Sequence, residues 1–226
     1  MSNDRSQSSA PRREADLTTD IVQREAPDTL DRATACMQQG GVLLVPTDTV
    51  YGLAVLPNMP SSVERLFVIK SRPGSVNLPI MVADATQLGG LGAKVSEAAK
   101  TLLNSEFVPG ALTLVFGIDK QRAPDWLKHR GEIAVRIPDD PFLLQLISCT
   151  GPILATSANR HGFDTPTVVE EILQQLEQQP DLAIDGGSVD TVPSTLVNCN
   201  VNPVRIERVG VIPVDEIERV LHDQQR

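Results

Sequence analysis

The chain has 226 residues, of which 41% are hydrophobic and 3% aromatic, so we expect one core built mainly from aliphatic side chains. Its net charge of −9 argues against a protein whose main task is to grip a nucleic-acid backbone, although a local cationic pocket is compatible with it. The apolar runs are far shorter than the roughly 18 residues that span a bilayer, and no signal peptide is visible, so we expect a cytoplasmic protein without membrane contact.

Residues 1–27 are polar and show little apolar periodicity, so we predict a mobile N-terminal tail followed by one domain over residues 28–226. Basic residues of the tail, such as Arg12 and Arg13, could touch RNA, but a solvated spacer is the favoured interpretation. We therefore expect the tail, through Arg24, to be dispensable for activity.

From Asp28 onward, helical and strand patterns alternate. Asp28 is expected to cap a first helix that stops at Gly40-Gly41, and Thr167 is expected to cap a later one. Further helices are expected from Ser61 or Ser62 to Ile69 and over 93–103, 142–147, 168–179 and 214–221. Strands are expected over 42–45, 51–55, 78–82, 112–116, 133–137, 153–155, 182–184, 196–197 and 204–207. Because some strands follow one another directly, the pattern predicts an α/β fold with a twisted, open, mixed sheet flanked by helices.

Two of the expected strands end in polar residues. Val42–Val45 leads into Pro46-Thr47-Asp48-Thr49, and Ile153–Ala155 leads into Thr156-Ser157-Ala158-Asn159. Open α/β sheets bind their ligands at such strand ends. On extended backbone, Thr47 and Thr49 would face one side and Asp48 the other, while Ser157 and Asn159 would also share a side. The alternative for Ser157 and Asn159 is a capped turn before Gly162.

Four cationic residues could complete an anion-binding pocket. Lys70 and Arg72 precede Pro73, which forces an extended backbone, so both side chains can point the same way. Arg136 and Arg208 each end an expected strand. Any one of them could simply pair with one of the 29 acidic residues, but the four together with the hydroxyl segments favour a pocket for a phosphorylated ligand and a small polar one.

Other site types are not supported. The sequence contains neither the G-x-G-x-x-G nor the G-x-x-x-x-G-K-[ST] phosphate loop, and no G-x-S-x-G elbow surrounds Ser157. The three cysteines are too scattered for a disulfide framework, and the histidines at 129, 161 and 222 are isolated, so we expect no metal ligands.

Several ordered motifs carry a resemblance to a known family. They are Pro-Thr-Asp-Thr-Val-Tyr-Gly-Leu from Pro46, Lys-x-Arg-Pro from Lys70, Pro-Gly-x-Leu-Thr from Pro109, Ala-Val-Arg-Ile-Pro from Ala134, Ser-x-Asn from Ser157, Asp-Gly-Gly from Asp185 and Ser-Thr from Ser194. In this order they resemble the YrdC-like L-threonylcarbamoyladenylate synthases over roughly residues 28–220. The likeness is to the short, single-domain form.

The resemblance implies a nucleotidyltransferase. It would join L-threonine, bicarbonate or CO2, and ATP to give L-threonylcarbamoyl-adenylate and pyrophosphate, for the threonylcarbamoyl-adenosine of tRNA. Mg²⁺ would arrive with ATP, and the product would pass to the downstream tRNA threonylcarbamoyl-transfer machinery. The resemblance assigns catalysis to Lys70 and Arg72. The residues implied at the threonine pocket are Thr49, Arg136, Ala155 and Ser194, and those implied at ATP are Arg72, Ser157, Asn159, Thr165 and Arg208.

The chain departs from the family pattern at three places. Met81 stands where some members have a histidine near threonine, Ala111 replaces a proline, and Thr191 replaces a glycine before Ser-Thr. Two other functions stay open from the residues: a non-catalytic RNA-binding module of the same fold, which the net charge disfavours, and a carbamoyl-transfer enzyme that uses ATP but not threonine.

Overall fold

The structure is a computed structural model that describes residues 19–71 and 77–223. Its helices are α1 (Thr29–Gln38), α2 (Pro60–Ile69), α3 (Glu97–Leu103), α4 (Pro141–Thr150), α5 (Val169–Gln175) and α6 (Val214–Asp223). Its strands are β1 (Asp20–Gln23), β2 (Leu43–Val45), β3 (Gly52–Val55), β4 (Ile80–Met81), β5 (Ala93–Lys94), β6 (Leu112–Ile118), β7 (Glu132–Arg136), β8 (Ile153–Ser157), β9 (Leu182–Asp185), β10 (Thr195–Asn198) and β11 (Arg205–Arg208). Among the described helices, none is both long and apolar enough to cross a bilayer.

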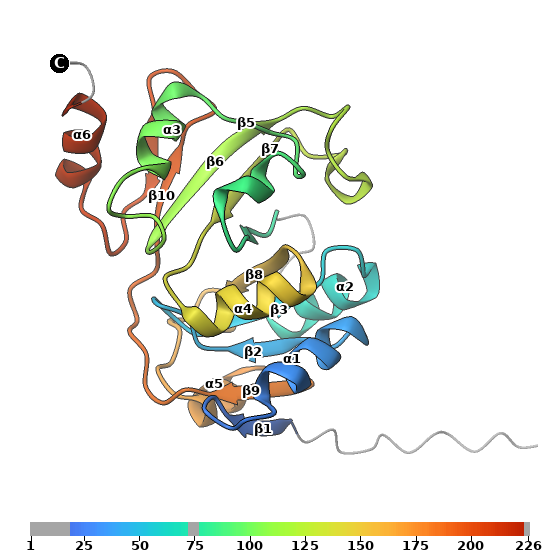
Figure 1. The fold of residues 1–226 in the computed structure, drawn as a ribbon. Helices are drawn as coiled ribbons and strands as arrows, with labels where there is room; N and C mark the ends of the chain where they lie inside the picture. The colour runs from blue at the N-terminus through green and yellow to red at the C-terminus, as the bar shows by residue number, and fades with distance from the viewer. Residues whose placement is uncertain (1–18, 72–76, 224–226) are drawn as a thin grey trace, which may run out of the picture.

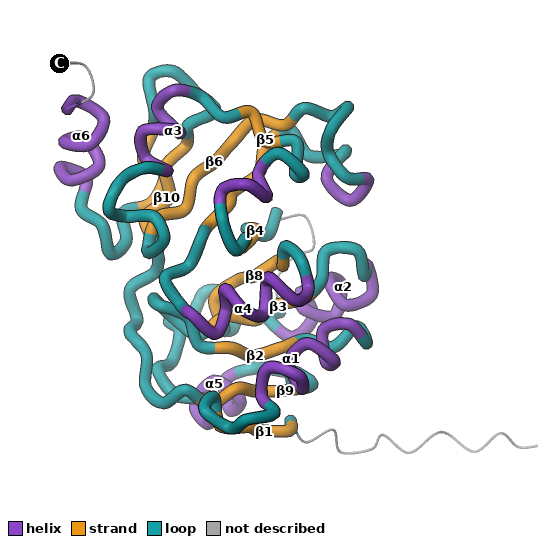
Figure 2. The backbone as a smooth tube through the Cα atoms, viewed as in Figure 1, coloured by secondary structure: helices purple, strands orange, loops and turns teal. Residues whose placement is uncertain are grey.

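The described strands form one open mixed sheet, as the sequence predicted. The order is β1-β9-β2-β3-β8-β4-β7-β6-β10-β11, and β5 pairs with β6 off this path. The pairs β1–β9, β2–β9, β4–β7 and β6–β10 are parallel, whereas β2–β3, β3–β8, β4–β8, β5–β6, β6–β7 and β10–β11 are antiparallel. Helices lie on both faces of this sheet (Figure 2).

The two faces of the sheet are covered to different extents. Along β2, Leu44 points into one core cluster with α2, α3, α5 and α6, while Leu43 and Val45 point into a second cluster with α1 and α4. The alternation follows from the period of two in a strand, and burial on both faces explains the continuous apolar run of β2. Figure 1 shows α1 and α4 in front of the half of the sheet that contains β2, β3 and β8.

The second cluster does not extend past β4 toward β7, β6 and β10. In β7, Ile133 and Val135 point into the larger cluster, so Ala134 and Arg136 emerge on the opposite face. Thr113 of β6 emerges on that face as well, opposite Arg136 in the strand register. The incompletely covered face is therefore where polar side chains of the sheet can line a cavity.

The prediction that the N-terminal tail extends to residue 27 is wrong, because residues 20–24 belong to the folded domain. Asp20–Gln23 form β1, which pairs in parallel with β9, and Val22 is buried. Arg24 then pairs with Asp140 at 2.8 Å, and Asp140 caps α4 by accepting the Leu143 N–H. A four-residue edge strand with one buried side chain carries too little periodicity to be found from sequence. Residues 1–18 lie outside the described residues.

Three local predictions also differ from the structure. Asp28 precedes α1 but makes no side-chain capping bond, and α5 begins after Val168 without a side-chain cap from Thr167. The expected helix over 93–103 is divided, because Ala93–Lys94 pair with β6 and Ser96 caps α3 by accepting the Ala99 N–H. Local propensity gave way to sheet pairing in this last case.

The contacts of β1 predict unequal effects of two N-terminal deletions. Removing residues 1–24 should lower the free energy of unfolding by about 2–4 kcal/mol, because it exposes Val22's neighbours and breaks the Arg24–Asp140 pair. Removing residues 1–18 leaves these contacts in place and is the matched control. Urea unfolding of both proteins measures the difference, and equal midpoints would show that β1 contributes nothing to stability.

Candidate functional site

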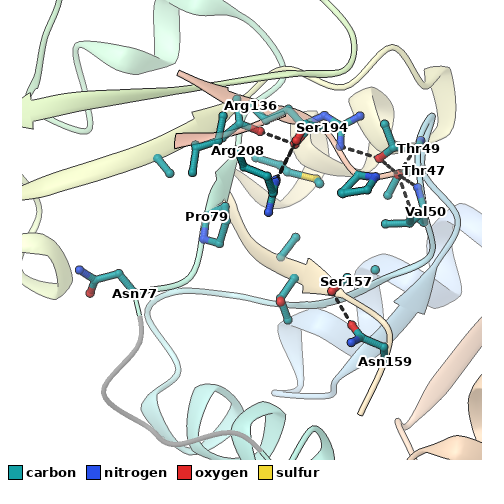
Figure 3. Close-up of a pocket in the computed structure, with 18 of the residues that line it drawn as sticks. Thr47, Thr49, Val50, Asn77, Pro79, Arg136, Ser157, Asn159, Ser194 and Arg208 are labelled. Atoms are coloured by element: carbon teal, nitrogen blue, oxygen red, sulfur yellow. Dashed lines mark hydrogen bonds between the residues drawn. The ribbon is translucent and has the colours of Figure 1, made fainter. Parts of the chain in front are cut away.

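A cavity of about 410 Å³ lies on the incompletely covered face of the sheet, where the polar strand ends converge. Its walls come from the turn after β2, the end of α2, the approach to β4, and strands β6, β7, β8, β10 and β11. The volume falls in the range of pockets for small molecules and cofactors. Figure 3 shows Arg136, Ser194 and Arg208 together on one side and Ser157 with Asn159 on another.

The turn after β2 is held by the hydroxyl of Thr47. Its Oγ1 accepts the N–H groups of Thr49 (3.0 Å) and Val50 (3.2 Å) and donates to the Val50 carbonyl (2.7 Å). The hydroxyls of Thr47 and Thr49 lie 3.1 Å apart, which confirms that they share a side. Because the segment bends rather than extends, Asp48 does not turn away as predicted. It points to the same cation as Thr49 does.

That cation is Arg136, which is only 5% exposed at the end of β7. Its Nη1 donates to Thr49 Oγ1 (2.8 Å), its Nη2 to Asp48 Oδ1 (2.7 Å) and its Nε to the carbonyl of Gly110 (2.9 Å). Burial lowers the pKa of Arg136, and the neighbouring Asp48 carboxylate opposes that shift. A guanidinium remains protonated in proteins, so Arg136 is a fixed positive charge with one carboxylate partner.

Arg208 is a second guanidinium at the same side of the cavity. Its Nε and Nη2 donate to the carbonyl of Ser194 at 3.0 and 2.9 Å, and Nη2 also lies 3.1 Å from Ser194 Oγ. None of the described carboxylates pairs with it. Burial and then the nearby charge of Arg136 lower the pKa of Arg208. Two guanidiniums that repel one another beside a cavity form a site that favours an anion.

The hydroxyl of Ser157, the last residue of β8, and the amide of Asn159 meet Lys70 at another wall. Ser157 Oγ donates to Asn159 Oδ1 at 2.5 Å, which confirms that these two side chains share a side. The ammonium of Lys70 donates to the carbonyl oxygens of Ser157 and Asn159 and to Asn159 Oδ1. The expected pairing of Lys70 with Arg72 falls outside the described residues, since Arg72 lies in the gap between 71 and 77.

Tyr51 ties the Asp-Gly-Gly segment to the turn after β2. Its hydroxyl donates to the Gly187 carbonyl (2.7 Å) and accepts the Gly186 N–H (3.1 Å). Burial, the largest cause, raises the pKa of Tyr51, so the hydroxyl stays protonated and keeps its donor. Asp185, Gly186 and Gly187 do not line the cavity, so this motif is connected to the turn after β2 through Tyr51.

The cavity brings together most of the residues that the sequence selected. Those that line it are Thr49, Lys70, Arg136, Ala155, Ser157, Asn159, Ser194 and Arg208. Thr165 does not line it and lies in the coil before α5, so its assignment to ATP rests on the resemblance alone. Of the three departures from the family pattern, only Met81 lines the cavity.

Sequence reasoning missed other lining residues. His161 lines the cavity, and its backbone N–H donates to the carbonyl of Lys70 at 2.9 Å, although the sequence did not select it as a site residue. Asn77, Pro79 and Pro193 also line it. The spacing of His161 two residues after Asn159 was the one available signal. Among the described residues, no group of three histidine, cysteine or acidic side chains is placed to hold a metal ion.

Comparison with known proteins identifies the family. The Sua5/YciO/YrdC family model, described as "Telomere recombination", matches residues 35–210. The chain belongs to this family. A Bacillus subtilis relative named threonylcarbamoyl-AMP synthase is 34% identical over 210 residues, which is 90% of this chain and 59% of the relative. The chain thus spans about three fifths of that relative's length.

Solved structures agree with this placement. The crystal structure of P. abyssi Sua5 complexed with L-threonine has a TM-score of 0.80 and 31% identity, and the match covers 90% of this chain and 60% of that one. The crystal structure of E. coli YciO has a TM-score of 0.75 and 27% identity, and the match covers 88% of this chain and 97% of YciO. The expected fold is therefore confirmed.

The packing around Ser194 predicts that a side chain at Gly210 destabilises the protein. A Cβ on Gly210 would lie 2.1 Å from the Pro193 carbonyl oxygen and 2.5 Å from the Ser194 carbonyl carbon. Gly210→Ala should therefore lower the free energy of unfolding by about 1–3 kcal/mol, because backbone next to Arg208's acceptor has to move. Gly131→Ala, where a Cβ meets nothing within 4 Å, is the control and should change it by less than about 0.5 kcal/mol. Urea unfolding gives both values, and a harmless Gly210→Ala would refute the close approach.

Proposed function

We propose that this chain synthesises L-threonylcarbamoyl-adenylate from L-threonine, bicarbonate or CO2, and ATP, with release of pyrophosphate, as a nucleotidyltransferase that serves threonylcarbamoyl-adenosine formation in tRNA. The names of the curated relatives and the threonine-bound P. abyssi structure support this proposal. Within it, the product passes to the tRNA threonylcarbamoyl-transfer machinery in the cytoplasm.

One observation carries the proposal. Arg136 and Arg208 meet beside Ser194 in one cavity, and of the two only Arg136 has a carboxylate partner among the described residues. The cavity therefore offers positive charge that its own described side chains do not neutralise. The reactants of the proposed synthesis are all anions: a triphosphate, a carbamate and an amino-acid carboxylate. Charge of this kind selects such ligands.

The chemistry needs positioning and charge neutralisation more than an acid–base pair. The amine of threonine takes up CO2 and loses a proton to give a carbamate. A carbamate oxygen then attacks the α-phosphorus of ATP, the bond from that phosphorus to the bridging oxygen breaks, and pyrophosphate leaves. Phosphoryl and nucleotidyl transfer of this type is accelerated chiefly by holding the reacting groups in line and by cations at the developing charge.

In this proposal different walls of the cavity bind different substrates. Thr49, Arg136, Ala155 and Ser194 bind threonine, with Met81 beside the methyl group. Arg208, Ser157 and Asn159 bind ATP, and Arg72 joins them on the strength of the resemblance. Mg²⁺ enters as part of the ATP substrate and keeps most of its waters, so a carboxylate cage on the protein is not required.

The first test identifies the product. Incubation with ATP, bicarbonate and L-threonine should yield threonylcarbamoyl-adenylate by mass spectrometry, with one pyrophosphate per product. Arg208→Gln should reduce its rate of formation about thirtyfold to several thousandfold, since losing one partner of a desolvated charge contact costs roughly 2–5 kcal/mol. Arg205→Gln, in the same strand but with a side chain that is 66% exposed, is the matched control and should keep near-full activity.

Other outcomes of this test favour the alternatives. Adenylate or AMP formation that does not need L-threonine would indicate a carbamoyl-transfer enzyme. Binding of RNA with steep salt dependence, in the absence of nucleotide binding, would indicate an RNA-binding module.

A second test concerns the amino acid. Valine lacks the hydroxyl that Thr49 and Ser194 would hydrogen-bond, and serine lacks the methyl that would contact Met81 and Ala155. Losing a methyl costs about 1–3 kcal/mol, whereas a site that hydrogen-bonds a substrate hydroxyl rejects an analogue without it by a factor of order 10⁴. Pyrophosphate release should therefore be slow with serine and much slower with valine. Equal rates with serine and valine would remove Thr49 and Ser194 from the hydroxyl site.

A further inference from the structure

Lys70 lines the cavity and bonds to the segment at the end of β8. It follows α2 directly, and the residue is only 2% exposed, although it still borders the cavity. A buried ammonium is stable only when its N–H groups have acceptors. The identity of those acceptors shows which part of the protein depends on Lys70.

The acceptors lie in one short segment. The ammonium donates to the carbonyl oxygen of Ser157, to the carbonyl oxygen of Asn159 at 2.7 Å and to Asn159 Oδ1 at 3.0 Å. An ammonium has three N–H donors, and residues 157–159 supply three acceptor oxygens to it. In return, the carbonyl of Lys70 accepts the N–H of His161 at 2.9 Å. Both the side-chain ammonium and the backbone carbonyl of Lys70 are thus bonded to the segment 157–161.

These bonds also set the direction of the side chains that face the cavity. Asn159 Oδ1 accepts from Lys70 and from Ser157 Oγ, while its Nδ2 donates to the carbonyls of Arg160 (3.0 Å) and Phe163 (2.5 Å). The proton of the Ser157 hydroxyl is therefore directed to Asn159. The lone pairs of Ser157 Oγ remain available to accept a hydrogen bond from a ligand donor, such as a ribose hydroxyl.

We propose that Lys70 is a positioning residue, whose ammonium holds residues 157–161 in their ligand-binding conformation and does not contact the phosphates of the substrate. The inference rests on the proposed function for the identity of the ligand, and it replaces the catalytic role expected for Lys70. Arg208 is the contrasting case, because its bonds to the described residues use Nε and Nη2, which leaves Nη1 for an anion.

A double-mutant cycle on ATP affinity tests the proposal. Lys70→Met and Asn159→Ala should each weaken ATP binding at least about tenfold, and the double variant should bind no more than about threefold worse than the weaker single one, because both changes remove the same arrangement. The cycle of Lys70→Met with Arg208→Gln is the control and should be multiplicative. Lys70→Arg should not restore affinity, since a planar fork cannot reproduce three bonds from one nitrogen. A multiplicative Lys70–Asn159 cycle, or full rescue by arginine, overturns the proposal.

Two measurements keep the test independent of variant folding and of the proposed function. In the wild-type protein, the ¹⁵Nζ resonance of Lys70 should keep its position when ATP is added, while the Arg208 side-chain resonance shifts; a large Lys70 shift overturns the proposal. Without any nucleotide, hydrogen exchange of the His161 amide should be at least about tenfold faster in Lys70→Met than in wild type, with β2 unchanged. Unchanged exchange at His161 refutes the proposal that Lys70 holds residues 157–161 in place. Failure of the wild-type protein to bind ATP refutes only the proposed function.

Discussion

The N–H groups of a buried cation require oxygen acceptors, and this requirement determines which segments form the walls of the cavity. Arg136 takes its oxygens from the turn after β2 and from Gly110, and Lys70 takes its oxygens from the end of β8. Each cation thereby joins segments that are far apart in the sequence. Arg208 differs, because its bonds to the described residues go to Ser194 and use Nε and Nη2 but not Nη1. Of these three described cations, Arg136 and Lys70 therefore link distant segments of the cavity wall, whereas Arg208 keeps an N–H group that its described protein contacts do not use.

Family membership and fold do not by themselves decide what the cavity does. E. coli YciO shares the fold over almost its whole length, as does the threonine-bound P. abyssi Sua5 over three fifths of its length. One fold hosts different functions, so the side chains at the site determine what the cavity binds. Here the hydroxyls of Thr49 and Ser194 lie beside the guanidiniums in the same cavity. That arrangement suits a small polar anion next to a phosphorylated one.

The sequence was informative where a local pattern decides the structure. Apolar runs followed by polar residues such as Thr47 and Ser157 marked the strand ends. Period-two spacing placed Ser157 and Asn159 on one side. It failed where tertiary contacts decide. The bend at Asp48 depends on the Thr47 hydroxyl and on Arg136, which lies 88 residues away. The strand β1 exists because β9 offers it an edge, and His161 reaches the cavity because its backbone is bonded to Lys70.

The interleaved strand order has a consequence for how the protein folds. β9 lies between β1 and β2, β8 lies between β3 and β4, and β10 pairs with β6. An N-terminal portion of the chain that ends before residue 182 therefore leaves the edges of β1 and β2 unpaired, and the cavity lacks a wall until Arg208 of β11 has been added. Unpaired edges invite association between chains, and sheets built from distant segments close slowly. During synthesis the binding site is thus among the last parts to form, so a nascent chain must bury much of its core before it can gain stability from a ligand.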